Sequence, residues 1–342
     1  MSTPRSERTD PPGHRGGETM RALVVEQGGG RGRVRCVRRP IPEPGPAEVV
    51  LRVAASGVNR ADLMQRDGAY PLRAGWTDVL GLEAGGTVVA VGDDVPTELL
   101  GTSRCALLPG GGHAEFVGVR ASHTLPVPAG IDPVDAAGLP EAAATVWSNV
   151  FALGAPEAGR WLLVHGGASG IGAMAIQLAV AHGIRVATTV GTAEKARFAQ
   201  ALGAEITVVH GEADFVEVLA SHDVRPQVIL DILGGDQLNR NLAVLARGGR
   251  VAVIGHLAGT PAPLDLDLLL RSQLTLTGTA LRSRPDREKD QIIAELQNRV
   301  WPHLAAGRIT PTTDARLRLD RADEALELLD SRAVRGKVLL IP

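Results

Sequence analysis

The sequence predicts an α/β protein of two domains, one built on a parallel sheet covered by helices on both faces and one mostly β. Short apolar strands alternate with helices from residue 161 onward, which is typical of a buried parallel sheet. A length of 342 residues also fits two domains better than one. We expect a disordered tail at 1–19, a mostly β domain at 20–140, the parallel-sheet domain at 141–280, and a return to the first domain at 281–342.

Each element follows from a local pattern of apolar residues. The mostly β part has strand-like runs at 21–27, 47–58, 87–92 and 113–119. The parallel sheet is expected from strands at 161–165, 184–190, 206–210, 228–233, 250–255 and 274–279, with helices at 172–183 and 192–203. The last part is predicted to hold an amphipathic helix at 288–307, a helix at 322–330 and a final strand at 336–342.

Composition excludes several classes of function. The formal net charge is −2, so charge gives no reason to expect nucleic acid or an anionic membrane as a partner. The two cysteines, Cys36 and Cys105, form no metal-ligand pair and no disulfide framework, which favours a reducing cytoplasm. The segment 161–184 has no charged residue, but its glycine run would break a membrane-spanning helix. The tail at 1–19 lacks the apolar centre of a signal peptide.

The run VHGGASGIG at 164–172 joins a predicted buried strand to a predicted buried helix. In that position a glycine loop lets backbone N–H groups and the positive end of the helix meet a pyrophosphate. Gly166, Gly170 and Gly172 also fit the loop of short-chain dehydrogenases, which need a Tyr-x-x-x-Lys pair downstream. The only tyrosine, Tyr70, precedes the loop, so that alternative fails.

The end of the second strand predicts which dinucleotide binds. Enzymes that use NADH usually have Asp or Glu there, about 20 residues after the loop, to hold the ribose hydroxyls. This chain has Gly191 instead, with Lys195 just beyond. Because a lysine attracts a 2′-phosphate and a carboxylate would repel it, the sequence favours NADPH. A solvated surface lysine is the alternative interpretation of Lys195.

Several separated motifs resemble those of the medium-chain dehydrogenase/reductase superfamily. Within it the chain is similar to the zinc-free quinone oxidoreductases, especially the branch of the p53-inducible quinone oxidoreductase homologue. The resemblance runs from Met20 to the C-terminus. Its motifs are ASGVNRADLMQRDGAYP at 55–71, GLEAGGTVVAVG at 81–92, LPEAAATVW at 139–147, GTALRSRP at 278–285 and RGKVLLIP at 335–342.

The resemblance implies a Rossmann domain, with its doubly wound parallel sheet, inside a GroES-like catalytic domain. It also implies that no metal is bound, because Asn59 and Leu82 occupy positions where zinc-using relatives have a cysteine and a histidine. Tyr70 and Asn59 are the implied catalytic residues, with a structural tyrosine and a turn-stabilising asparagine as the alternatives. The implied cofactor-binding residues are Asn59, Thr145, Ser169, Gly170, Ile171, Gly191, Lys195, His210, Gly255, His256 and Arg332.

We therefore expect a soluble, cytoplasmic enzyme that reduces a quinone or enone with NADPH, by hydride transfer or by single-electron steps. Two alternatives stay open: reduction of the C=C bond of 2-alkenals or enoyl thioesters on the same scaffold, and a non-catalytic NADPH-binding role. His165 resembles an acid–base residue, but a satisfied structural histidine is the better interpretation. The resemblance further predicts a homodimer that pairs through the edge strand at 274–279.

Overall fold

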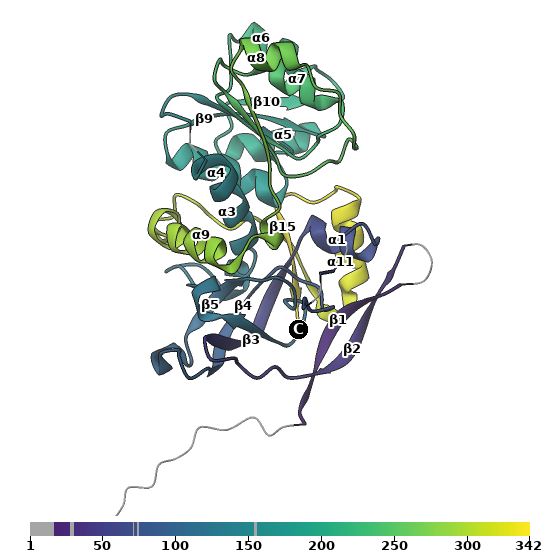
Figure 1. Cartoon of the computed structure of the whole chain (residues 1–342), viewed down its shortest axis with the longest axis vertical. Helices are drawn as coiled ribbons and strands as arrows, with labels where there is room; N and C mark the ends of the chain where they lie inside the picture. Colours follow the sequence, from purple (N-terminus) through teal and green to yellow (C-terminus); the bar gives the residue numbers. More distant parts are fainter. Residues whose placement is uncertain (1–16, 28–30, 71, 74, 154–155) are drawn as a thin grey trace, which may run out of the picture.

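The computed structural model describes residues 17–27, 31–70, 72–73, 75–153 and 156–342. Two parts are stacked along the long axis of the molecule, with a six-stranded sheet in the upper part and a seven-stranded sheet in the lower part (Figure 1). Helix α3 (Pro140–Val146) and strand β15 (Lys337–Ile341) lie where the two parts meet. None of the helices in the described part of the chain is long and apolar enough to cross a membrane.

The upper sheet is parallel throughout, in the order β10-β9-β8-β11-β12-β13. Its strands are β8 (Trp161–His165), β9 (Arg185–Val190), β10 (Ile206–Val209), β11 (Val228–Asp231), β12 (Arg250–Val253) and β13 (Thr275–Gly278). The strand order reverses between β8 and β11, because β9 and β10 extend the sheet on one side of β8 and β11, β12 and β13 extend it on the other. Sheets of this kind bind dinucleotides at such a switch point. The predicted doubly wound Rossmann sheet is confirmed.

Helices cover both faces of this sheet, which explains why its strands are apolar on both sides. Leu162 and Val164 of β8 pack with α3, α4 (Gly170–Ala181) and α5 (Ala193–Ala201). Leu163, between them, points to the opposite face and packs with α6 (Phe215–Ser221) and α7 (Gln237–Val244). Each fully buried leucine of this kind contributes about 1.5–3 kcal/mol to folding.

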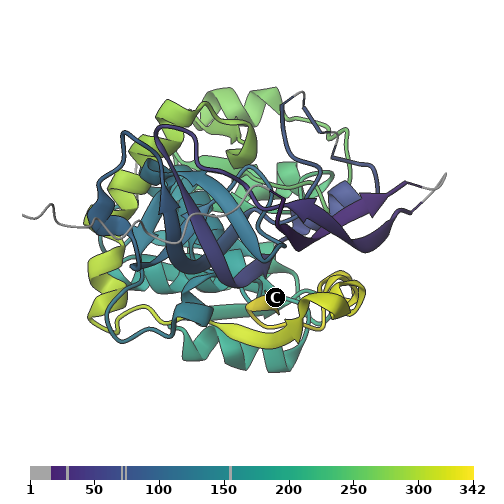
Figure 2. The same cartoon turned by 90° about the horizontal axis from the view of Figure 1, so that it is seen from below.

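The lower sheet is mainly antiparallel and runs β14-β15-β3-β4-β5-β7, with β6 also paired to β3. Its strands are β3 (Glu48–Val58), β4 (Glu83–Val91), β5 (Ser103–Leu107), β6 (Phe116–Arg120), β7 (Thr124–Pro126), β14 (Thr313–Arg318) and β15. A separate ribbon, β1 (Thr19–Glu26) with β2 (Arg33–Pro40), extends from one side of the body (Figure 2). The final strand of the chain therefore pairs with β3, more than 250 residues earlier in sequence.

The remaining elements connect or cover the two sheets. They are α1 (Arg60–Arg66), η1 (Thr97–Leu99), η2 (Ala121–His123), α2 (Pro133–Ala136), η3 (Trp147–Phe151), α8 (Leu266–Arg271), η4 (Leu281–Ser283), α9 (Asp286–Arg299), α10 (Trp301–Ala305), η5 (Leu319–Arg321) and α11 (Ala322–Asp330). The prediction of a single helix at 288–307 is wrong, because this segment forms two helices, α9 and α10, with an interruption at Val300. Pro302 has no N–H to donate to the carbonyl of Asn298, so a new helix starts there.

The C-terminal segment passes directly beneath the glycine loop of the upper part. The Gly336 N–H donates to the Ala168 carbonyl at 2.8 Å, and Gly336 also forms an isolated β-bridge with Ser169. Gly336 has φ of +90°, and a Cβ there would overlap the carbonyl oxygen of Thr312. This contact therefore depends on glycine both for its backbone conformation and for its close approach.

We predict that Gly336→Ala destabilises the protein by about 2–5 kcal/mol, from backbone strain of about 1–2 kcal/mol plus steric overlap of about 1–3 kcal/mol. Gly307→Ala is the matched control, because Gly307 also has positive φ (+68°) but has no atom within 4 Å of the added Cβ. Denaturant unfolding of both variants measures the difference. Equal losses of stability would contradict the close approach at Gly336.

Candidate active site and cofactor-binding cleft

The predicted glycine loop connects β8 to α4 at the switch point of the sheet. Ser169 is the N-cap of α4: its hydroxyl accepts a hydrogen bond from the Gly172 N–H at 3.0 Å and donates to the Gly166 carbonyl at 2.8 Å. A Cβ at Gly172 would overlap the backbone of Gly166 and Gly167, so glycine is required for the tight turn. The loop thus presents the N-terminus of a 12-residue helix, a geometry suited to a pyrophosphate.

The residues at the start of α4 meet the C-terminal segment of the chain. A Cβ at Gly170 would overlap the side chain of Lys337, which leaves room only for glycine. Ile171, the next residue, is partly buried against the large core of the upper sheet. Ser169, Gly170 and Ile171 therefore lie together at the helix N-terminus, as the sequence predicts for the loop contacts.

The end of β9 carries the residues expected at the adenosine end of a dinucleotide. Gly191 lies beside His210, whose Nε2 would be 3.5 Å from a Cβ at that glycine. Thr192 caps α5 by accepting a hydrogen bond from the Lys195 N–H at 3.2 Å. The Lys195 ammonium donates to the carbonyl of Arg332. The structure thus brings Gly191, Lys195, His210 and Arg332 together.

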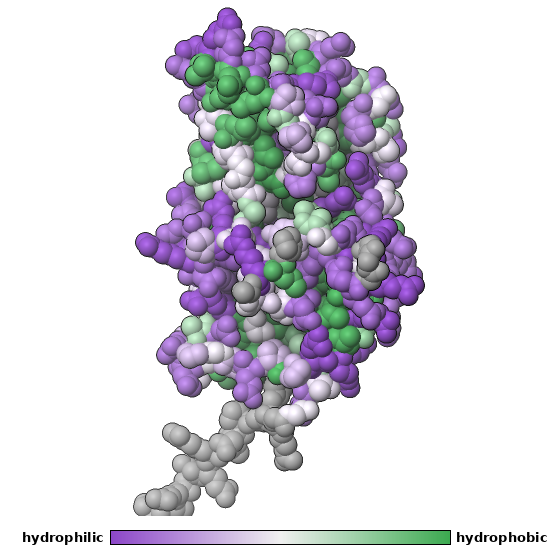
Figure 3. All heavy atoms as spheres, turned by 45° about the vertical axis from the view of Figure 1, so that its right-hand side comes forward, coloured by the Kyte–Doolittle hydropathy of each residue, from purple (hydrophilic) through white to green (hydrophobic). Residues whose placement is uncertain are grey.

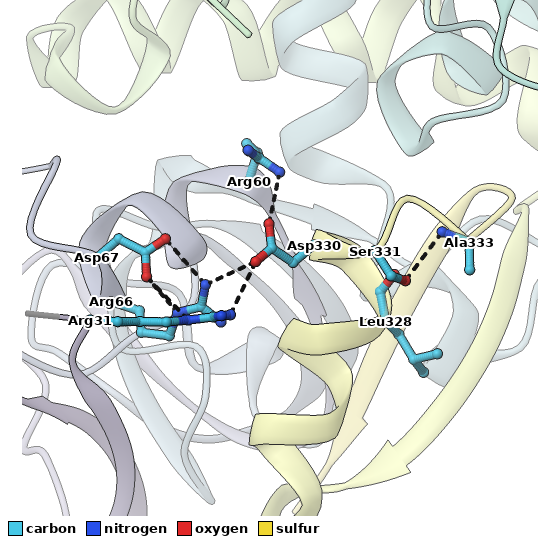
Figure 4. A network of polar contacts seen from close by, with 8 residues as sticks. All are labelled: Arg31, Arg60, Arg66, Asp67, Leu328, Asp330, Ser331 and Ala333. Atoms are coloured by element: carbon cyan, nitrogen blue, oxygen red, sulfur yellow. Dashed lines mark hydrogen bonds and ion pairs between the residues drawn. The ribbon is translucent and has the colours of Figure 1, made fainter.

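A network of ion pairs fixes the segment that carries Arg332. The carboxylate of Asp330, at the end of α11, pairs with Arg31 at 3.0 Å, with Arg66 at 3.3 Å and with Arg60 at 3.4 Å (Figure 4). Two residues later the backbone of Arg332 adopts φ of +56°. The network anchors α11 to α1, and it therefore fixes the position of the backbone just before Arg332.

Arg335 also belongs to this group, although it is not among the residues that the sequence predicts. Its guanidinium pairs with Glu194 at 2.7 Å and with Asp314 at 3.6 Å. Burial lowers the pKa of Lys195, and the nearby positive charges of Arg332 and Arg335 lower it further, against the opposing effects of Asp314 and Glu194. Arg335 lies 140 positions from Lys195 in sequence, and no spacing pattern indicates that they meet.

A buried polar network lies between the two parts, around the predicted catalytic residue Asn59. The Lys337 ammonium donates to Asn59 Oδ1 at 2.7 Å and forms an ion pair with Glu83, whose side chain is fully buried. Asn59 Nδ2 donates to Glu83 Oε1 at 3.0 Å and to the Gly57 carbonyl at 3.1 Å. Both N–H groups of the Asn59 amide are therefore already used.

A second buried cluster, formed by Ser56, His113 and Asp62, contacts Asn59 through the Asp62 carboxylate, which accepts a hydrogen bond from the Asn59 backbone N–H at 2.7 Å. His113 Nδ1 lies 2.7 Å from Ser56 Oγ, and His113 Nε2 lies 3.5 Å from Asp62. Burial acts to raise the pKa of Asp62, but His113 and the N–H groups of Asn59 and Gly81 outweigh it and lower that pKa. All three side chains are at most 2% exposed, so this serine–histidine–aspartate set is inaccessible to a substrate and is structural.

The other predicted catalytic residue, Tyr70, lies in an aromatic and cationic cluster after α1. The guanidinium of Arg282 stacks 5.2 Å from the Tyr70 ring and 4.5 Å from the Trp76 ring. Arg282 Nε donates to the Pro109 carbonyl at 2.7 Å and Nη1 donates to Gln65 at 2.9 Å. The Tyr70 hydroxyl has no hydrogen-bond partner among the described residues. Burial raises the pKa of this phenol, with Arg282 opposing the effect.

Thr145, Gly255 and His256 are the remaining predicted cofactor-binding residues. Thr145 is buried on α3, and its carbonyl accepts a hydrogen bond from Asn149 at 2.8 Å. Gly255 and His256 follow β12 and pack beside the loop after β11. Within the described ranges, no hydrogen bond joins these three residues to Asn59. The interpretation of His165 is confirmed: it is buried and bonds Thr189 at 2.9 Å and Asn241 at 2.7 Å.

Two parts of the chain match known protein families. Residues 45–129 match the alcohol dehydrogenase GroES-like domain, and residues 170–298 match the zinc-binding dehydrogenase family. The residues here do not fit a zinc ion, because Asn59 and Leu82 offer neither thiolate nor imidazole and Glu83 is paired with Lys337. In the residues that the structure describes, no group of three or more His, Cys, Asp or Glu side chains could hold a metal.

Whole-chain relatives agree with these matches. The chain is 28% identical to the quinone oxidoreductase of Rattus norvegicus, over 95% of this chain and 99% of that one. It superimposes on the Escherichia coli quinone oxidoreductase complexed with NADPH with a TM-score of 0.84, at 28% identity over 94% of this chain and all of the other. A mycobacterial quinone oxidoreductase is 30% identical, with a TM-score of 0.80, over 95% of this chain and 100% of its own. The chain therefore belongs to the quinone oxidoreductase family of the medium-chain dehydrogenase/reductase superfamily.

Proposed function

We propose that this protein reduces quinones with NADPH and without a catalytic metal. The observation that carries the proposal is the position of Lys195, with Arg332 and Arg335 beside it, at the end of the second Rossmann strand. The glycine loop at the N-terminus of α4 supplies the pyrophosphate site at the neighbouring strand. Together these groups match the charge distribution of NADPH, and the Escherichia coli relative binds the same cofactor.

The residues of the chain divide between the two ends of the cofactor. Ser169, Gly170 and Ile171 would hold the pyrophosphate, and Lys195 and Arg332 would hold the 2′-phosphate near Gly191 and His210. Thr145, Gly255 and His256 would contact the nicotinamide, with Asn59 beside its ribose. When bound, NADPH supplies the hydride, so the protein has to orient the acceptor and stabilise the charge on its oxygen.

The free hydroxyl of Tyr70 favours this residue over Asn59 as a hydrogen-bond donor to the acceptor. Both N–H groups of the Asn59 amide donate within the buried network, so Asn59 is better suited to holding the cofactor side of the site. Tyr70 lies against Arg282, whose positive charge favours a partly negative oxygen nearby. A quinone or a conjugated enone would each develop such an oxygen.

Further features support the remaining expectations. The string GTALRSRP at 278–285 supports membership of the branch of the p53-inducible quinone oxidoreductase homologue. The division into 20–140 with 281–342 as catalytic domain, and 141–280 as cofactor domain, is supported by the two separate sheets. A cytoplasmic location is supported by Cys36 and Cys105, both of which are free thiols.

We predict that the purified protein oxidises NADPH much faster than NADH when an ortho-quinone is present, and that a chelator has no effect. A spectrophotometric assay compares both cofactors with the ortho-quinone and with a 2-alkenal. Faster turnover of the alkenal would contradict quinone reduction and would support reduction of a C=C bond instead. Tight NADPH binding without turnover of either acceptor would instead support a non-catalytic role.

We predict that Lys195→Ala and Arg332→Ala each raise the Kd of NADPH by about 10–100-fold, because each removes a charged contact to the 2′-phosphate worth about 1.5–3 kcal/mol. The Kd of NADH should stay within twofold. Arg299→Ala is the control, since Arg299 is an exposed cation on α9. Fluorescence titration measures each Kd. Equal weakening of NADPH and NADH would contradict the assignment of the 2′-phosphate site.

We also propose a homodimer through the edge strand predicted at 274–279. In the described part of the chain, β13 is the terminal strand of the upper sheet and pairs only with β12. The upper part of the molecule presents a green, apolar area in Figure 3. The exposed large apolar side chains of the upper part include Leu264, Leu266, Leu270 and Leu276. An open strand beside apolar surface supports pairing with a second copy.

Light scattering at micromolar concentration should therefore give the mass of two subunits. We predict that Leu276→Arg shifts this mass to one subunit, because it places a charge on β13 where the second copy would pair. Leu100→Arg, at an exposed leucine of the lower part, is the control and should leave the mass unchanged. A wild-type mass of one subunit would contradict the dimer.

A further inference from the structure

We propose that Glu141 is the proton donor of the reaction and protonates the oxygen of the acceptor as hydride arrives. The inference rests on the proposed reduction of a quinone or enone and names the acid that this reduction needs. No motif in the sequence indicates this role. It follows from where the first turn of α3 lies and from the charges around it.

The backbone fixes Glu141 at the junction of the two parts. Its N–H donates to Glu83 Oε2 at 2.9 Å, which ties the start of α3 to the Glu83–Lys337 ion pair. Thr145, the predicted nicotinamide contact, lies one helical turn further along α3. Because residues four apart share a face of a helix, Glu141 and Thr145 face the same side. Glu141 thus belongs to the region where the reacting atoms are expected.

The carboxyl group of Glu141 is partly buried and has no hydrogen-bond partner among the residues that the structure describes. Charged and titratable groups face it from several elements, and the Tyr70–Arg282 pair of the aromatic and cationic cluster is among them. These groups are Asp62 of α1, Tyr70 of the following loop, Glu83 of β4, Arg282 of η4, Lys289 of α9 and Lys337 of β15. Because the Glu141 carboxyl lies near these groups without a hydrogen-bond partner among the described residues, it is free to form a hydrogen bond with a ligand.

This environment keeps Glu141 protonated at neutral pH. Burial is the largest cause and the negative charge of Glu83 adds to it, and together they raise the pKa of Glu141 to about 8. Lys337 and Lys289 oppose the effect without cancelling it. A carboxylic acid with a pKa near the working pH is an efficient general acid.

The step balances in protons and electrons. The C4–H bond of NADPH breaks and its hydride, with two electrons, passes to the acceptor, leaving NADP⁺. The O–H bond of Glu141 breaks while an O–H bond forms on the acceptor oxygen, which gives a hydroquinone or an enol. The Glu141 carboxylate then takes a proton from water, so each turnover consumes one NADPH and one solvent proton.

The protonation state is tested without cofactor, by comparing the wild type with Glu141→Gln in denaturant at several pH values. The folded pKa is about 8, whereas an ordinary glutamate has a pKa of 4.5. The folded state therefore holds an extra proton between these values, and its stability falls as pH rises through this window. From pH 5 to pH 9 the unfolding constant of the wild type should rise at least tenfold relative to that of the glutamine variant. Parallel curves would overturn the proposal.

Single-turnover kinetics tests the catalytic step with saturating NADPH and an ortho-quinone. At pH 7 the Glu141→Gln variant should be slower by about 10²-fold or more, with the Kd of NADPH within twofold of the wild type. The wild-type rate should fall above pH 8, and the variant should lose that inflection. Glu295→Gln, an exposed carboxylate on α9, is the control and should match the wild type.

The outcomes separate this inference from the proposed function. A wild type that reduces the quinone while Glu141→Gln stays within threefold of it would overturn the role of Glu141 alone. A wild type that oxidises NADPH with neither acceptor would overturn both. Loss of the inflection together with the slower rate in the variant would establish Glu141 as the acid.

Discussion

The ion pair between Lys337 and Glu83 is the interaction on which the geometry of the site depends. Both side chains are buried, so an unpaired charge on either would cost several kcal/mol. The pair joins the last strand of the chain to β4, and through it Asn59, the start of α3 and the glycine loop are held at fixed positions. The two parts therefore meet at a buried polar network.

This arrangement separates two electrostatic tasks. Near the end of β9, Lys195, Arg332 and Arg335 gather positive charge, which suits the proposed 2′-phosphate site. At the junction of the two parts, Lys337 neutralises Glu83, and the neighbouring Glu141 carboxyl has no hydrogen-bond partner among the described residues. Reduction by hydride needs no strong nucleophile, and the serine–histidine–aspartate cluster found among the described residues is buried in the lower part of the molecule. The polar groups that remain accessible suit orientation of an acceptor and transfer of a proton.

Local patterns in the sequence predict most of the fold. The strands of the parallel sheet, the glycine loop and the last helix and strand all follow from short-range apolar periodicity and glycine placement. The broken helix at Pro302 is an exception, because a long amphipathic pattern continues across the proline. The site is harder to predict, since each of Arg282, Arg335, Lys337 and Glu141 contacts at least one partner more than 50 positions away. Such contacts depend on how β15 inserts beside β3, which no local pattern encodes.

The resemblance of motifs suggested the proposed cofactor-binding residues, whereas the structure indicated the groups proposed to surround the acceptor. Arg282 belongs to a motif that the sequence singles out, yet only the fold shows its stacking on Tyr70 and Trp76. Glu141 likewise follows Pro140 in a recognisable motif, and its environment comes entirely from other elements. For charged residues in or next to family motifs, such as Arg282 and Glu141, the structure therefore identifies contact partners that the sequence does not predict.

A crystal structure of this protein with NADPH tests the central claim most directly. We predict the pyrophosphate at the N-terminus of α4, the 2′-phosphate within hydrogen-bond distance of Lys195 and Arg332, and the nicotinamide against Thr145 with its C4 facing Tyr70 and Glu141. A cofactor bound with its 2′-phosphate away from Lys195, or with its nicotinamide far from α3, would contradict it.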